Sequence, residues 1–344
     1  MSASDRQGAK VRLAIVGCGA VTELSHLPAA RLVPEVEVVA LADKDLARAR
    51  RLAERFGVAH WVDDYHALIG DVNGMIVALP NHLHAPVARE LLEKRVAVLV
   101  EKPLASTLQE ARELTGAART AGLPLQAGHM YRFSKAARLV KRVLEEGWLG
   151  PLRQFSLQYG VVSNWPATSG FYWRKEQAGG GVLMDLGPHM LDLLLWWLGE
   201  AHDVDYRDDA AGGVEADCRL ALTLGADALP GEVTLSRVRR LGGNATIVGE
   251  QFTLDCDFRS LQVRIRPTVW EEQAPAFLAD FAGGDTFRRM FVEQLRAFAA
   301  VIRYGGAPVV SGDDVLPALA LIERCYRDRR PLELPWLRPV ALPV

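Results

Sequence analysis

An apolar run that ends in two glycines is the feature that most constrains how this chain can fold. Residues 11–16 are apolar or β-branched except for one arginine, and Gly17 and Gly19 follow directly. A strand, a Gly-x-Gly turn and then a helix begin a βαβ unit of the dinucleotide-binding type. Gly17 would allow the tight turn. Gly19, with Ala20 and Val21 after it, would bring backbone N–H groups close to a pyrophosphate.

The next strand carries the second part of this pattern. The third position of the glycine fingerprint is Thr22 rather than Gly or Ala, which weakens the helix–strand packing part of the motif. A strand is predicted at residues 36–42 and ends at Asp43. A carboxylate there binds ribose hydroxyls and repels a 2′-phosphate, so NAD is favoured over NADP. Lys44 could still accept a phosphate, and Asp43 could instead cap the helix that begins near Asp45.

Strands and helices keep alternating as far as residue 127. Further helices are predicted at 45–56, 85–94 and 107–121, and further strands at 74–79, 96–100 and 123–127. Apolar strands separated by helices indicate a doubly wound parallel sheet, whose ligands bind beyond the carboxyl ends of the strands. The cofactor-binding positions expected at those ends are Leu79, Pro80, Asn81 and Glu101.

Lys102 is a candidate catalytic group. It follows a central strand, so its ammonium would point into the cofactor crevice, where partial burial would lower its pKa. The alternative is a lysine that reaches to solvent and pairs with Glu101.

A carboxylate and an imidazole lie four residues apart after three consecutive glycines. Asp185 and His189 would share one helix face, and an imidazole beside a carboxylate can move a proton at neutral pH. As an isolated pair they would more often form a surface ion pair. Pro188 predicts either a kinked helix or a helix that begins at Pro188 with Asp185 in the turn before it. Asp192, one turn further, could orient the imidazole.

The second half of the chain has a different pattern. A helix is predicted at 136–146 and a strand at 152–161, and residues 162–178 are rich in aromatic and basic side chains. Aromatic faces and cations suit a sugar, so Tyr159, Trp173 and Arg174 are candidates for the substrate pocket. The alternative is an ordinary aromatic loop under the domain.

Short strands punctuated by glycines dominate the region that follows. They are predicted around 204 and at 216–224, 232–237, 245–248, 252–257 and 262–265, and two helices are predicted at 287–302 and 314–326. A final strand is predicted at 332–334, before a Pro-rich tail. This spacing indicates a large, open, mostly antiparallel sheet in a second α/β domain. One face of such a sheet often forms an oligomer interface, so we expect a homodimer or homotetramer.

Composition excludes several classes of function. The chain has 344 residues, enough for two domains, and its net charge of −2 without a basic block argues against nucleic acid or a membrane surface as a partner. Its four cysteines lack the spacing of a metal site and indicate reduced thiols. A zinc-type site of Asp185, His189 and Asp192 would lack a second histidine or a cysteine at fitting spacing, so no metal is expected. Without an apolar signal core at the N-terminus, we expect a cytoplasmic protein.

Taken together, these motifs resemble those of the Gfo/Idh/MocA family of oxidoreductases, the relatives of glucose–fructose oxidoreductase and inositol dehydrogenase. They are Gly17 and Gly19; His26, Pro28 and Ala29; Pro80, Asn81 and His84; Glu101, Lys102 and Pro103; and Asp185, Gly187 and His189. The resemblance implies a Rossmann domain (1–128) and a domain for substrate binding and oligomerisation (129–344). It also implies a cis peptide before Pro103, hydride transfer with NAD(P), and catalytic roles for Lys102, Asp185 and His189. His84 matches a position beside the cofactor in the same family.

The leading hypothesis is therefore an NAD-dependent dehydrogenase of a sugar or cyclic polyol, with NADP not excluded. His189 would take the proton of the hydroxyl, and Lys102 would bind the same oxygen. Asp185 would bind a neighbouring hydroxyl or bias the imidazole. One alternative retains and recycles a tightly bound cofactor, as a sugar–sugar oxidoreductase or a redox-assisted glycosidase. Another is a non-catalytic protein that senses the cofactor.

Overall fold

Six parallel strands form the first sheet of the computed structural model, which describes residues 9–162, 165–268 and 285–333. Their order is β3-β2-β1-β4-β5-β6. The bounds are β1 (Val11–Val16), β2 (Val36–Ala42), β3 (His60–Val62), β4 (Gly74–Val77), β5 (Ala97–Glu101) and β6 (Leu125–Gly128). The strands predicted from apolar runs are confirmed, whereas β3 carries exposed residues and was not predicted.

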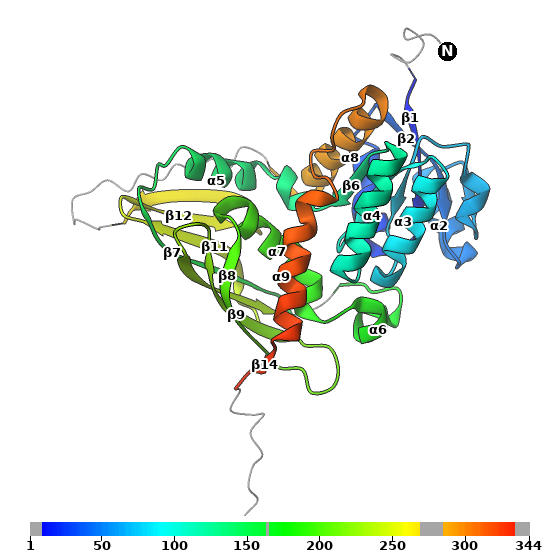
Figure 1. The fold of residues 1–344 in the computed structure, drawn as a ribbon. Coiled ribbons are helices and arrows are strands. Elements are labelled where there is room, and N and C mark those ends of the chain that lie inside the picture. Colours follow the sequence, from blue (N-terminus) through cyan, green and yellow to red (C-terminus); the bar gives the residue numbers. More distant parts are fainter. Residues whose placement is uncertain (1–8, 163–164, 269–284, 334–344) are drawn as a thin grey trace, which may run out of the picture.

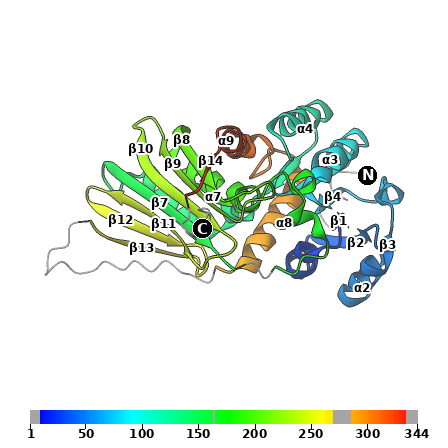
Figure 2. The same cartoon turned by 90° about the horizontal axis from the view of Figure 1, so that it is seen from below.

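Helices cover both faces of this sheet (Figure 2). They are α1 (Leu27–Ala30), α2 (Leu46–Phe56), α3 (His84–Glu93), α4 (Leu108–Ala121) and, from much later in the chain, α8 (Phe287–Tyr304). Local signals set their ends, since Thr107 and Glu110 form a capping box for α4, and Gly57 and Gly122 end α2 and α4 in the left-handed conformation. The strand residue Gly74 lets α8 come close, because a Cβ there would lie 2.9 Å from a side-chain carbon of Ile302.

Eight strands form the second sheet, in the order β13-β12-β11-β7-β10-β9-β8-β14. The bounds are β7 (Leu152–Gly160), β8 (Ala201–Asp208), β9 (Asp217–Leu224), β10 (Leu229–Ser236), β11 (Gly242–Gly249), β12 (Phe252–Asp257), β13 (Gln262–Pro267) and β14 (Arg330–Pro331). The pairs β7–β10 and β8–β14 are parallel and the other pairs are antiparallel, which confirms a mostly antiparallel sheet. The last strand begins two residues earlier than predicted, and residue 334 and the tail lie outside the described residues.

The remaining helices lie on the second sheet or between the two sheets (Figure 1). They are α5 (Lys135–Glu145), α6 (Lys175–Ala178), α7 (Val182–Leu198) and α9 (Leu316–Arg327). Helices α5 and α7 lie on the second sheet, and α9 lies between α7 and α4. One continuous cluster of buried apolar side chains runs through both sheets. Within the described ranges no helix has the length and apolar character needed to cross a membrane.

Helix α7 differs from one of the two predicted forms. It begins at Val182 and continues through Pro188 to Leu198, so the prediction of a helix that starts at Pro188 is wrong. Pro188 has no N–H to donate within the helix, but the turn before it is held from outside, as described below. Asp185 and His189 therefore lie four residues apart on one continuous helix, with Asp185 in its first turn.

Candidate active site

A cavity of about 530 Å³ lies where the carboxyl ends of the first sheet face α7 and the second sheet. Nearly all of the predicted site residues line it: Gly17, Gly19, Ala20, Val21, Asp43, Lys44, Leu79, Pro80, Asn81, His84, Glu101, Lys102, Tyr159, Trp173, Asp185 and His189. Arg174 does not line it and is exposed. Motifs that are up to 172 positions apart in the chain thus meet in one place.

The glycine turn has the geometry expected for a dinucleotide. Gly17 has a φ of +102°, and a Cβ there would lie 2.2 Å from the carbonyl oxygen of Ala78, so a side chain is excluded. A Cβ on Gly19 would meet only Thr168, at 3.7 Å, and would fill space that opens into the cavity. The Thr22 hydroxyl donates to the Gly17 carbonyl at 2.6 Å. Thr22, which stands at the third fingerprint position in place of Gly or Ala, therefore stabilises the turn itself.

Asp43 closes the other side of this turn. Its carboxylate accepts the N–H of Cys18 at 2.7 Å and of Asp45 at 2.8 Å, and Arg48 lies 3.7 Å away. The cap of α2 is Asp45, which accepts the N–H of Arg48, so Asp43 does not have the alternative capping role. A carboxylate has about four acceptor positions, so Asp43 can still bind hydroxyl groups in the cavity.

The ends of β4 and β5 build the next part of the wall. The ring nitrogens of His84 lie 2.7 Å from the carbonyl oxygens of Pro103 and Leu79, which ties these two strand ends together. Glu101 binds His26 at 2.8 Å inside the protein, and the peptide between Lys102 and Pro103 is cis. The alternative in which Lys102 pairs with Glu101 is therefore not adopted.

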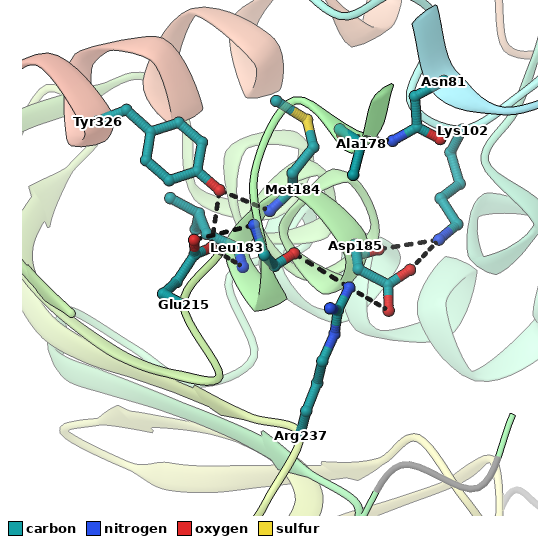
Figure 3. Close-up of polar contacts among 10 residues, drawn as sticks. Asn81, Lys102, Ala178, Leu183, Met184, Asp185, Glu215, Arg237 and Tyr326 are labelled. Atoms are coloured by element: carbon teal, nitrogen blue, oxygen red, sulfur yellow. Dashed lines mark hydrogen bonds and ion pairs between the residues drawn. The ribbon is translucent and has the colours of Figure 1, made fainter. Parts of the chain in front are cut away.

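Lys102 instead reaches across to α7 (Figure 3). Its Nζ donates to the Asp185 carboxylate at 2.6 Å and to the Asp185 carbonyl oxygen at 3.0 Å. Arg237, at the end of β10, approaches the second carboxylate oxygen at 3.2 Å and donates to the carbonyl oxygen of Gly181 at 3.1 Å. Asp185 is thus held between two cations. An ammonium has three hydrogens, so Lys102 keeps one for a ligand.

Charges in this group stabilise one another. Burial alone would lower the pKa of Lys102, but Asp185, Tyr172 and Glu101 together outweigh burial and raise that pKa above its usual range. Burial would raise the pKa of Asp185, yet Lys102 and Arg237 lower it to about 2. At neutral pH the lysine is therefore cationic and the aspartate anionic.

His189 is held in its neutral form. It is 7% exposed, and burial lowers its pKa well below the usual value, helped by the positive charge of Lys102 and by His129. The ring of Tyr131 lies edge-on at 5.3 Å between centroids. The Nδ1 atom of His189 is buried and has no hydrogen-bond partner in the described ranges. A neutral imidazole at the cavity wall can accept a proton.

Asp192 does not orient His189, so that expectation is wrong. Arg132 binds both oxygens of Asp192 at 2.7 Å, and His129 lies 3.4 Å from one of them. A bidentate guanidinium satisfies the carboxylate more completely than an imidazole would. Among residues 9–162, 165–268 and 285–333, no cluster of three or more His, Cys, Asp or Glu side chains could hold a metal ion.

Two groups of functional side chains were not found from the sequence. Arg237 ended a predicted strand, where an arginine is usually solvated, but it is only 7% exposed and lies under the rings of Tyr172 and Trp173. Glu215 and Tyr326, which contact the start of α7, carry no motif at all. The aromatic segment was predicted as a pocket wall, and Trp165 and Tyr172 line the cavity together with Trp173.

Family profiles match both halves of the chain. The profile described as "Oxidoreductase family, NAD-binding Rossmann fold" matches residues 11–129, and the one described as "GFO/IDH/MocA C-terminal domain" matches residues 137–255. The D-glucoside 3-dehydrogenase of Escherichia coli is 33% identical over 55% of this chain and 54% of its own length. The D-apiose dehydrogenase of Paraburkholderia graminis is 29% identical over 95% and 91%.

Solved structures extend the similarity to the whole fold. A 3-ketoreductase from Actinomadura kijaniata, in complex with NADP and TDP-benzene, aligns with a TM-score of 0.82 at 26% identity. The alignment covers 95% of this chain and 100% of that one. For four of the curated relatives, including the glucoside dehydrogenase, the matched region spans only about half of the relative's own length.

Proposed function

The chain belongs to the Gfo/Idh/MocA family of oxidoreductases, and we propose that it transfers a hydride between a nicotinamide cofactor and a hydroxyl or keto group of a sugar, cyclic polyol or sugar derivative. One observation carries this proposal. Lys102, after β5 of the first sheet, and Asp185, in the first turn of α7, form an ion pair at 2.6 Å on the wall of the cavity that the glycine turn and the neutral His189 also line.

In the direction of oxidation, His189 accepts the proton of the substrate hydroxyl. Lys102 donates its remaining hydrogen to the same oxygen and stabilises the negative charge that develops there. Asp185 keeps Lys102 protonated and aimed, and it is itself fixed by Arg237. The nicotinamide, when bound, supplies the hydride acceptor or donor. In reduction the same residues return the proton to the oxygen.

The residues present fit such a cofactor. A side chain on Gly17 would collide with Ala78, and the space next to Gly19 is open to the cavity, as an approaching pyrophosphate requires. Asp43 lies at the end of β2, where it would bind the ribose hydroxyls, so NAD is proposed as the preferred cofactor over NADP. We place cofactor binding in residues 1–128 and substrate binding in residues 129–344.

Relatives support the class of substrate. The two curated relatives named above are a glucoside dehydrogenase and an apiose dehydrogenase, and the ketoreductase was solved with a nucleotide analogue. All three names refer to sugars or to nucleotide chemistry. The flat rings of Tyr172 and Trp173 at the cavity give this chain a surface on which a sugar ring can lie.

We also propose an oligomeric state and a location for this protein. Along β7, Phe155 and Leu157 are buried while Ser156 and Gln158 are exposed, so one face of the second sheet can meet another copy in a homodimer or homotetramer. All four cysteines are free and buried, which supports a reducing, cytoplasmic location. Light scattering of the purified protein measures the oligomer directly.

Substrate screening with two variants tests the proposed reaction. Sugars, inositols, glycosides and nucleotide-linked sugars are offered with NAD and with NADP, and formation of the reduced cofactor is followed. His189→Ala should lower kcat by about 10²–10⁴-fold because the proton acceptor is lost, and Lys102→Ala should also lower kcat strongly. Both should bind the cofactor nearly as the unchanged protein does.

His60→Ala, an exposed histidine on β3, is the matched control and should keep full activity. Turnover close to that of the unchanged protein in both site variants would contradict these roles. A reduced-nicotinamide absorbance in the purified protein, before any addition, would instead indicate a cofactor that is retained and recycled.

A further inference from the structure

The first turn of α7 is closed by two side chains from distant parts of the chain (Figure 3). Glu215, in the loop between β8 and β9, accepts the N–H groups of Gly181 and Leu183, both at 2.9 Å. Tyr326, on α9, accepts the N–H of Met184 at 3.1 Å and donates its hydroxyl to Glu215 at 2.7 Å. We call this pair the α7 clamp. It satisfies N–H groups that have no partner within a helix.

The glycines before α7 exist to admit this clamp. A Cβ on Gly180 would lie 2.0 Å from the Tyr326 hydroxyl oxygen, and a Cβ on Gly181 would lie 1.9 Å from the backbone oxygen of Glu215. Gly179 has a φ of +79°, which ends α6 in the left-handed region. Three consecutive glycines are thus explained by a tight turn and two close approaches, rather than by a phosphate site.

Glu215 is almost fully buried, at 3% exposure. Burial raises its pKa, and the hydrogen bonds from Tyr326 and Leu183 oppose that rise. A buried carboxylate is stable at a helix N-terminus because it receives N–H hydrogen bonds and the favourable end of the helix dipole. Glu215 is therefore bound to the first turn at several points, since its backbone oxygen also accepts the N–H of Val182 at 2.9 Å.

The clamped turn is the one that carries Asp185. Asp185 follows Met184 directly, and its N–H donates to the Gly181 carbonyl oxygen at 3.1 Å. Arg237 binds this same carbonyl oxygen and the Asp185 carboxylate. A shift of the Gly181–Met184 turn would therefore carry Asp185 with it and change the contact with Lys102. Neither Glu215 nor Tyr326 lines the cavity, so neither touches a ligand there.

We propose that Glu215 and Tyr326 are positioning residues of the reaction: by holding the N–H groups of the first turn of α7, they fix Asp185 against Lys102 and fix His189 one turn further along. The inference rests on the proposed function, because it assigns the clamp to the hydride-transfer site. The clamp links α9 and the second sheet to the residue that keeps Lys102 in place. The clamp therefore affects the chemical step and not the binding of the cofactor, whose wall is built from the first sheet.

Tyr326→Phe and Glu215→Gln test the clamp in the full-length protein with its best substrate. The first removes one hydroxyl and leaves the N–H of Met184 without an acceptor, and the second replaces one acceptor oxygen by an N–H₂ donor. Each should lower kcat about tenfold or more, because small misplacements of reacting groups are costly. The Kd for the reduced cofactor should stay within about twofold. The isotope effect on kcat with substrate deuterated at the reacting carbon should increase, since the chemical step is slowed.

The pair acts as one unit, so the double variant should lose no more than the worse single variant. Tyr304→Phe removes an exposed tyrosine hydroxyl at the end of α8 and should change none of these quantities. All assays are run below the measured melting temperature of each protein, and Glu215→Gln carries the test if Tyr326→Phe does not fold. If the unchanged protein is active and the variants keep its kcat, the proposed role of the clamp is overturned and the proposed function is not. An unchanged protein that oxidises or reduces nothing in the panel overturns the proposed function and the clamp with it.

Discussion

At the scale of single residues, the charge states of His189 and Lys102 decide at which pH the site can work. The pKa of His189 lies well below its usual value, so the neutral, proton-accepting form persists when the pH falls below 6.5. The pKa of Lys102 is raised, so the ammonium persists beyond pH 10.5. Both working forms are present throughout the neutral range.

The pH profile of alcohol oxidation follows from these two shifts. We expect kcat/KM to fall on the acid side only below pH 6.5, because protonation of His189 removes the base. Asp185→Asn removes the anion that raises the pKa of Lys102, so the fall on the basic side should move to lower pH in that variant. A half-maximal point at pH 7 or above on the acid side in the unchanged protein would contradict the assignment of His189.

Residue identity predicted most of the site, but not its pairings. Strand ends and motif spacing predicted that Asp43, Lys102 and Asp185 would meet at one crevice, and all three line the cavity. The contacts between residues on distant elements could not be predicted, because Arg237 contacts Asp185 only after β10 and α7 have come together. Asp192 shows the same limit, because its spacing of three residues from His189 does not reveal that Arg132 binds its carboxylate.

At the scale of elements, α7 shows how tertiary contacts override a local signal. Pro188 allowed either a kinked helix or a helix that begins at Pro188, and the sequence alone did not decide between the two. The deciding contacts come from Glu215 and Tyr326, which bind the N–H groups that a helix start leaves open. By contrast, the ends of α4 were predictable, because the capping residues Thr107 and Gly122 lie next to the helix that they end.

Two glycine substitutions separate the role of the clamp turn from ordinary helix propensity. Gly181→Ala should lower the free energy of unfolding by about 1–3 kcal/mol, because its Cβ would overlap the backbone of Glu215 and force a shift. Gly116→Ala, inside α4, meets no atom within 4 Å and should raise the free energy of unfolding by about 0.5–1 kcal/mol. Denaturant titration measures both. Equal effects of the two substitutions would mean that the turn before α7 has room to spare.

At the scale of the whole molecule, both sheets were predictable and their joining was not. Apolar runs and glycine punctuation indicated a parallel sheet followed by a mostly antiparallel one, as observed. The periodicity of residues 287–302 predicted a helix, but it could not show that α8 returns to cover the first sheet beside α1. An amphipathic pattern identifies the face that is buried without identifying what buries it. The second half of the chain thus completes the core of the first.

This shared core predicts how the protein unfolds. One continuous apolar cluster runs through both sheets, and α9 contacts both α7 and α4, so unfolding of one half would expose apolar surface of the other. We therefore expect a single calorimetric transition. NADH at about 100 times its Kd should stabilise the folded protein by about 2.7 kcal/mol and shift that transition without splitting it. His189→Ala should show the same shift, because the wall that would hold the dinucleotide comes from the first sheet. Two resolved transitions, or a cofactor shift confined to one of them, would mean that the halves fold independently and that the cavity between them is not held by a common core.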